Sequence, residues 1–235
     1  MSLLSVQNIN TGYDKKQVLF DISLEVEKGE TILLIGANGS GKSTLLKAIY
    51  GILPLWEGGE SKGKIIYEGK DITNISTNHL IKKGLMYIPQ KNELFEDMTV
   101  AENLKMSTLF LSNSTETKKR LEDVFEKNSL LKDRQKQIVN RLSGGERKQL
   151  SLGMILMNRP KLLLYDEPLA GLSGNNIEYT IHQLTEIKEA GTTIIIVEHR
   201  IKELILFADK VIGLKLGYMQ KDNLTDLEKI KMFLV

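Results

Sequence analysis

The chain has 235 residues, and its 32 Lys and Arg residues against 30 Asp and Glu residues give a formal net charge of +2. This balance gives no indication of a strongly charged partner such as a nucleic acid. The absence of cysteine excludes disulfides, thiol catalysis and thiolate metal sites. No apolar run approaches the roughly 18 residues that a membrane-spanning helix requires, and residues 1–4 lack the pattern of a secretory signal. We therefore expect one large domain, or a core with a subdomain, without a membrane span.

The N-terminal part of the chain alternates apolar and polar side chains, which predicts half-buried antiparallel strands at residues 4–6 and 18–26. After a turn at residues 28–30, Thr31–Ile35 predicts a fully buried strand. A glycine-rich loop then leads into a predicted helix at residues 42–50, which ends before Pro54. The glycines of residues 58–63 predict a turn before an edge strand at Lys64–Tyr67.

The hydrophobic period becomes helical from Ala101 to about Met157, and residues 112–115 and 140–141 are typical of linkers or caps between helices. Buried strands follow at residues 161–165 and 192–197, separated by a helix at residues 175–190. Strands that alternate with helices indicate an α/β fold with a parallel sheet. We expect one domain over residues 1–235, in which residues 1–90 and 159–235 form the core and residues 91–158 form an inserted α-helical subdomain.

One segment matches the P-loop pattern G-x-x-x-x-G-K-[ST], in which backbone N–H groups and a lysine hold phosphates. Its members are Gly36, Ala37, Asn38, Gly39, Ser40, Gly41, Lys42, Ser43 and Thr44. The alternative is a glycine-rich turn with a solvated lysine. A lysine at a helix N-terminus is disfavoured by the helix dipole unless an anion is bound there. We therefore interpret the segment as a phosphate site, in which Lys42 contacts the β- and γ-phosphates and the Ser43 hydroxyl ligates Mg²⁺.

Two carboxylates, Asp166 and Glu167, stand at the end of a strand too apolar to lie at the surface. Because successive side chains of a strand point to opposite faces, the two should have different tasks. Asp166 is placed to hold Mg²⁺ and Glu167 to polarise the water that attacks the γ-phosphate. His199 also follows a buried strand, and ligands of open α/β sheets bind at the carboxyl ends of the strands. The alternatives are an acidic turn and a structural histidine.

The segment Leu142–Glu146 reads Leu-Ser-Gly-Gly-Glu and precedes a helical sequence. Ser143, Gly144 and Gly145 could form a second anion cradle at the start of that helix. The same residues fit an ordinary capping box, because Glu146 follows Ser143 by three positions. Both interpretations can hold together, since a well-capped helix presents its N–H groups rigidly.

In this order, the P-loop, the Leu-Ser-Gly-Gly-Glu segment and the acidic pair strongly resemble the ATP-binding-cassette (ABC) ATPases, and the resemblance extends from Tyr13 to about Lys215. It implies a P-loop ATPase core with an N-terminal antiparallel β subdomain, and ATP and Mg²⁺ as ligands. It further implies that His199 contacts the γ-phosphate, that Gln90 reaches Mg²⁺ and the attacking water, and that Tyr13 stacks on adenine. In this family the Ser143–Gly145 cradle faces the nucleotide of a neighbouring subunit.

The resemblance also implies partners: a second ABC ATPase in a homodimer or heterodimer, and integral membrane permease subunits at the cytoplasmic face of the membrane. Residues 93–104 lie where such subunits receive a permease helix. Leu94, Phe95 and Met98 could line that groove or pack in the subdomain core. The segment is most similar to branched-chain amino-acid importers, which work with a solute-binding protein. ATPases of lipid exporters and soluble, non-transport ABC ATPases are the alternatives.

Two positions depart from the family pattern. Ser173 stands where many relatives carry aspartate, and Arg200 stands where aspartate is frequent in importer subunits. The first departure lies in a loop that the resemblance implies in contacts across the dimer, and its effect is left open; nothing in the sequence explains the second.

Overall fold

The computed structural model describes residues 2–14, 16–55, 63–91, 94–109 and 114–220. Most of the turn predicted at residues 58–63, the first two residues of the linker predicted at 112–115, and Glu93 lie outside this range.

The N-terminal strands form a four-stranded antiparallel sheet in the order β2-β1-β4-β5. Its members are β1 (Ser2–Tyr13), β2 (Lys16–Glu27), β4 (Lys64–Tyr67) and β5 (Lys70–Asp71). The prediction of antiparallel strands here is confirmed. Buried residues alternate with exposed ones in the second half of β2, as a sheet with one face in the core requires, whereas β1 is buried continuously at residues 3–6.

A second sheet has six strands in the order β10-β9-β3-β8-β7-β6. They are β3 (Thr31–Ile35), β6 (Leu85–Ile88), β7 (Leu162–Asp166), β8 (Thr193–Val197), β9 (Lys210–Lys215) and β10 (Tyr218–Met219). All neighbours pair in parallel except β10, which pairs antiparallel with β9. Strands β3, β7 and β8 are buried throughout, as expected for a parallel sheet covered on both faces. The short strands β6, β9 and β10 were not among the predicted elements.

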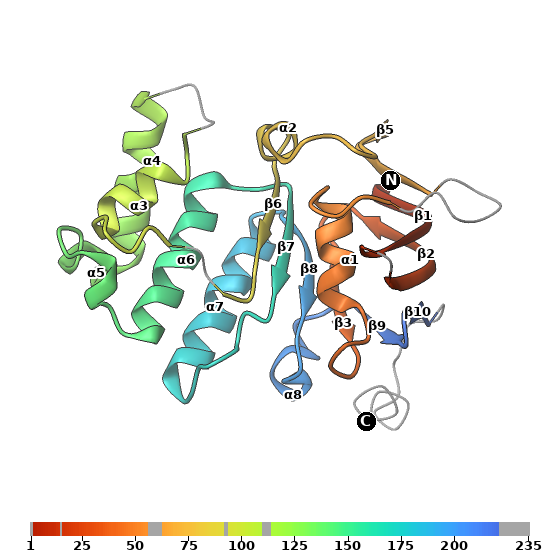
Figure 1. The fold of residues 1–235 in the computed structure, drawn as a ribbon. Coiled ribbons are helices and arrows are strands. Elements are labelled where there is room, and N and C mark those ends of the chain that lie inside the picture. The colour runs from red at the N-terminus through yellow and green to blue at the C-terminus, as the bar shows by residue number, and fades with distance from the viewer. Residues whose placement is uncertain (1, 15, 56–62, 92–93, 110–113, 221–235) are drawn as a thin grey trace.

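Helices cover both faces of the six-stranded sheet (Figure 1). Helix α1 (Lys42–Ile49) lies between the two sheets, where its apolar side chains share one core with both of them. On the opposite face, a second core joins the sheet to α6 (Gly144–Asn158), α7 (Asn175–Glu189) and α8 (Ile201–Leu204). The short helix α2 (Thr77–Lys82) precedes β6.

The remaining helices gather at one end of the molecule, at the left of Figure 1, around a core of their own. They are α3 (Val100–Met106), α4 (Ser114–Lys127), α5 (Ser129–Asp133) and a 3₁₀ turn at Val139–Arg141. Of the residues predicted to be linkers or caps, Ser114 and Thr115 form the first turn of α4, and residues 140–141 belong to the 3₁₀ turn. The exact limits of the predicted subdomain, residues 91–158, stay a prediction.

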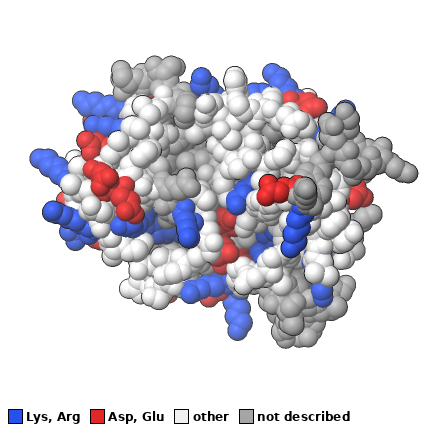
Figure 2. All heavy atoms as spheres, viewed as in Figure 1, with Lys and Arg blue, Asp and Glu red and all other residues white. Residues whose placement is uncertain are grey.

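Among the described residues, no helix combines the length and the apolar character needed to cross a bilayer. Lys and Arg are interspersed with Asp and Glu over the face shown in Figure 2, in keeping with the small net charge.

Candidate functional site

The carboxyl ends of the central strands bring the predicted residues to one edge of the sheet. Parallel strands β3, β8 and β7 are neighbours, and the glycine loop, His199 and the acidic pair lie at or just after their ends. Because parallel strands end at the same edge, segments far apart in sequence meet there. The Ser43 hydroxyl, for example, donates a hydrogen bond of 3.0 Å to Asp166 Oδ1, although the two residues are 123 positions apart.

Glycines 36 and 41 allow the loop between β3 and α1 to pass close to other parts of the chain. Both have positive φ angles, 156° and 105°. A Cβ on Gly36 would lie 2.2 Å from the carbonyl oxygen of Leu214, and one on Gly41 would lie 2.5 Å from a methyl of Leu19. Gly41 is also the N-cap of α1 and supplies no side-chain cap. The first N–H groups of the helix therefore remain available to an anion.

The Lys42 ammonium lies inside the loop that carries it. Its Nζ donates to the carbonyl oxygens of Gly36 at 2.8 Å and Ala37 at 3.0 Å. The side chain is buried, and this burial lowers the pKa of Lys42, whereas Glu167 and Asp166 act in the opposite direction. Acidic neighbours thus help to keep a buried cation at the start of a helix.

Asp166 is the last residue of β7 and is only 3% exposed. Burial raises its pKa, and the Ser43 hydrogen bond and nearby lysines oppose this rise. A hydroxyl and a carboxylate at 3.0 Å are oxygen donors of the kind that Mg²⁺ prefers. Mg²⁺ usually binds through one or two carboxylates plus substrate phosphates and water, so this small donor set fits the ion.

Glu167 turns away from the strand at a φ of 49°, in the left-handed region. Its Oε2 accepts a hydrogen bond of 2.5 Å from Gln90 Nε2, and its Oε1 lies 3.3 Å from His199 Nε2. Glu167 therefore contacts both of the other predicted residues, Gln90 and His199. Asp166 instead contacts Ser43, so the two adjacent carboxylates have different partners, as the alternation along the strand predicts.

Tyr13 lies at the end of β1, beside α1, with 42% of its surface exposed. Lys47 of α1 stands 5.7 Å from the centre of its ring and donates to its hydroxyl at 3.4 Å. An exposed ring beside the helix that follows the glycine loop suits stacking on a flat base.

The Ser143–Gly145 segment begins α6 as a capping box. Ser143 Oγ accepts from the Glu146 N–H at 3.3 Å, and Glu146 Oε2 accepts from the Ser143 N–H at 2.7 Å. Ser143 and Gly144 are exposed, and nothing lies within 4 Å of a Cβ placed on Gly144. A Cβ on Gly145 would lie 2.9 Å from the amide of Asn176, so α7 supports the segment from behind. The capped helix start faces open space.

Three residues near this site were not predicted to have a role. The Glu198 carboxylate is 2% exposed and accepts backbone N–H groups from two loops. Lys148 is buried on the face of α6 that packs on the sheet, 4% exposed. Arg200, which the sequence left unexplained, donates from Nη1 to the carbonyl of Leu172 at 2.9 Å. The sequence carried one signal for Lys148: it is a charged residue on the largely apolar face of α6.

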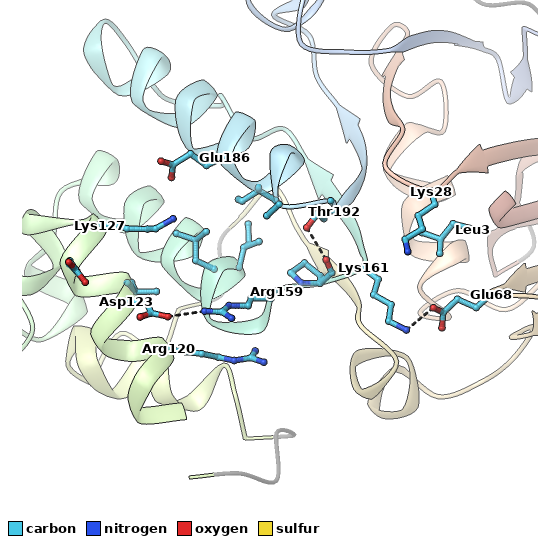
Figure 3. A pocket seen from close by; sticks show the side chains of 18 residues that line it. Leu3, Lys28, Glu68, Arg120, Asp123, Lys127, Arg159, Lys161, Glu186 and Thr192 are labelled. Carbon is cyan, nitrogen blue, oxygen red and sulfur yellow. Dashed lines mark hydrogen bonds and ion pairs between the residues drawn. The ribbon is translucent and has the colours of Figure 1, made fainter. Parts of the chain in front are cut away.

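A cavity of about 890 Å³ lies elsewhere, at the amino ends of β7 and β8 and between α4, α6 and α7 (Figure 3). Arg159 pairs with Asp123 at 2.8 Å and Lys161 with Glu68 at 2.6 Å across its wall. These pairs leave the two cations neutralised, and the cavity contains none of the residues at the carboxyl edge.

Three features lie at the carboxyl edge of the parallel sheet: the glycine loop, an aspartate beside the loop serine, and a glutamate in contact with a glutamine and a histidine. This arrangement places the chain among the P-loop nucleoside triphosphatases. Residues 19–170 match the family model described as ABC transporter, and the chain belongs to this family. It is an ATP-hydrolysing subunit of an ABC transporter.

Individual relatives agree with this assignment. The chain is 35% identical to the high-affinity branched-chain amino acid transport ATP-binding protein BraG of Pseudomonas aeruginosa, over 92% of this chain and 90% of BraG. It is 29% identical to the lipopolysaccharide export system ATP-binding protein LptB of Haemophilus influenzae, over 87% of this chain and 83% of LptB. A solved ATP-binding cassette of an ABC transporter in its ADP conformation superposes with a TM-score of 0.81, at 29% identity, over 98% of this chain and 94% of the other.

Proposed function

We propose that ATP is bound between two subunits, either two copies of this chain or this chain and a second ABC ATPase. The loop of residues 36–44 holds the phosphates in one subunit, and the Ser143–Gly145 cradle of the partner covers the γ-phosphate. The observation that carries this proposal is the exposed, rigidly capped start of α6, which offers N–H groups to an anion outside its own subunit.

Within each site we assign the hydrolytic roles from the contacts described above. Glu167 polarises the attacking water, and Gln90 and His199 hold the carboxylate and the γ-phosphate in place. Lys42 neutralises the β- and γ-phosphates, and Tyr13 stacks on adenine. Ser43, Asp166 and Gln90 would hold Mg²⁺. The ion supplies charge neutralisation to the phosphates.

Binding and hydrolysis then drive a cycle. ATP favours the closed dimer because it binds that form better, and loss of the γ-phosphate favours reopening. We infer that this motion reaches membrane permease subunits, with the ATPase at the cytoplasmic face of the membrane. Phe95, 47% exposed, is the residue best placed to contact a permease helix, because Leu94 packs against the core of the helical end.

For the transported solute we propose branched-chain amino acids, which a solute-binding protein would deliver to the permease. Support comes from the similarity to BraG over nearly the whole chain. Lipid export is the second candidate, favoured by the similarity to LptB. Purification of this chain with its permease, followed by solute-stimulated ATPase assays in proteoliposomes, separates the two: stimulation by leucine and its binding protein supports import, and stimulation by a lipid substrate contradicts it.

A test of the shared site uses two complementary variants. Lys42→Ala removes the phosphate lysine, and Ser143→Arg blocks the cradle. Each variant alone should lack ATPase activity, whereas a mixture should recover part of it, because a mixed dimer contains one site with both parts intact. Glu167→Gln, which we expect to bind ATP without hydrolysing it, should dimerise with Mg-ATP in light scattering. A mixture without activity, together with a monomeric Glu167→Gln at saturating Mg-ATP, would contradict the proposal.

A further inference from the structure

Lys148 stands where the helix pattern calls for an apolar residue. It lies in the second turn of α6, and Leu152 and Ile155, four and seven positions later, pack in the core between α6 and the sheet. A lysine at such a position normally extends its ammonium to water. Here the side chain is 4% exposed, and Nζ lies 4.9 Å from the centre of the buried Tyr165 ring.

The surroundings of this ammonium are acidic. Burial lowers the pKa of Lys148 to about 8, and the groups that oppose this and favour its charge are Glu198 first, then Glu167 and Asp166. Burying a cation is costly unless carboxylates face it. The helix that begins with the Ser143–Gly145 cradle therefore directs a positive charge toward the reacting end of the same subunit.

Glu198 joins the loop that follows β7 to the loop that follows β8. Its Oε1 accepts the N–H groups of His199 at 2.7 Å and Arg200 at 3.2 Å, and its Oε2 accepts the N–H of Leu169 at 2.9 Å. One buried carboxylate thus holds both the backbone of His199 and the loop that follows Glu167. The Arg200 side chain makes a further hydrogen bond to the loop after Glu167, at the carbonyl oxygen of Leu172.

We propose that Glu198 and Lys148 are positioning residues for ATP hydrolysis: Glu198 fixes His199 and the loop of residues 168–173 relative to each other, and Lys148, held over the Tyr165 ring, places a positive charge on the α6 side of this junction. Neither residue touches the nucleotide. Their effect reaches the reaction through His199 and Glu167, so the inference rests on the roles proposed above for those two residues.

The arrangement predicts a separation of binding from turnover. The phosphate loop, residues 36–44, lies between β3 and α1, whereas the Glu198 carboxylate accepts its hydrogen bonds from Leu169, His199 and Arg200, so affinity for ATP should not depend on the junction. A displacement of the histidine or glutamate of the order of 1 Å is enough to lower a rate about 100-fold. Loss of the junction should therefore lower kcat and leave KM for ATP nearly unchanged.

The experiment compares four variants with the wild type in steady-state ATPase assays, nucleotide binding and thermal unfolding. Glu198→Gln places an N–H donor against backbone donors, and Lys148→Met keeps the side-chain volume without the charge. Lys148→Arg restores the charge. Lys132→Met, at an exposed position of α5, is the control for the loss of one lysine.

We expect kcat to fall on the order of 10- to 100-fold in Glu198→Gln and Lys148→Met, with KM and nucleotide affinity within about twofold of the wild type. Lys148→Arg should recover most of the activity, and Lys132→Met should retain it. Because Lys148→Met is expected to fold at least as well as the wild type, reduced stability would not account for its loss.

Three results would overturn the inference: wild-type kcat in Lys148→Met, equal activity of Lys148→Met and Lys148→Arg, or a loss of ATP affinity that parallels the loss of kcat. Glu167→Gln is measured alongside. If that variant hydrolyses ATP normally, the failure lies in the proposed role of Glu167 rather than in the junction.

Discussion

Replacement of Lys148 by methionine should stabilise this protein at neutral pH, although it is expected to slow turnover. Burial lowers the pKa of Lys148 from 10.5 to about 8. Each tenfold change in a proton equilibrium is about 1.4 kcal/mol. The shift therefore lowers the free energy of unfolding of the wild type by roughly 3 kcal/mol while the lysine is charged. Methionine of similar length removes the penalty and fills the same space.

The sign of the pH dependence follows from the two protonation states. Below a pH of about 8 the lysine is protonated in both the folded and the unfolded chain, so the wild type has the full penalty. Between 8 and 10.5 the folded chain loses the proton that the unfolded chain retains, and the stability of the wild type rises toward that of the variant. The advantage of Lys148→Met should therefore shrink as pH rises.

The assay is urea unfolding of both proteins in nucleotide-free buffer with EDTA, at steps from about pH 7 to pH 10. Other titrating groups are common to the two chains, so the difference between their free energies of unfolding isolates Lys148. A difference that stays constant over this range, or a variant less stable than the wild type at pH 7, would refute the reasoning that a buried charge is responsible.

The remaining predictions concern the residues of the site. Glu167→Gln should lower kcat on the order of 10²–10⁴-fold, the usual contribution of a general base, and isothermal titration should still detect ATP binding. Gly36→Ala should lose about 1–3 kcal/mol of stability and weaken ATP binding, because its Cβ would lie 2.2 Å from the Leu214 carbonyl oxygen; unchanged urea midpoints would contradict this. Gly145→Ala should lower turnover because its Cβ would meet the Asn176 amide at 2.9 Å, and a second change, Asn176→Ala, should restore it; no recovery in the double variant would place the cause elsewhere.

Short-range patterns in the sequence were enough for much of the fold. The alternation in the first two strands predicted the antiparallel sheet, and the wholly apolar runs before the glycine loop, the acidic pair and His199 predicted the buried parallel strands β3, β7 and β8. These signals are reliable because the period of the apolar residues directly reports which face of an element is buried. Strands β6 and β9 were not predicted, and in β9 Gly213 interrupts the apolar run and so weakens its pattern.

The sequence also predicted the phosphate loop, because its glycines, lysine and serine stand at fixed spacing and act within a few residues of one another. The sequence by itself therefore determined which groups are present and in which order they follow the strands. The tertiary structure decided which of them meet. The burial of Lys148 near carboxylates and the bond between Glu198 and the Leu169 amide depend on packing between segments 18 or more residues apart. No local period encodes such contacts, since they are created only when α6 and the loops after β7 and β8 are brought together by the sheet.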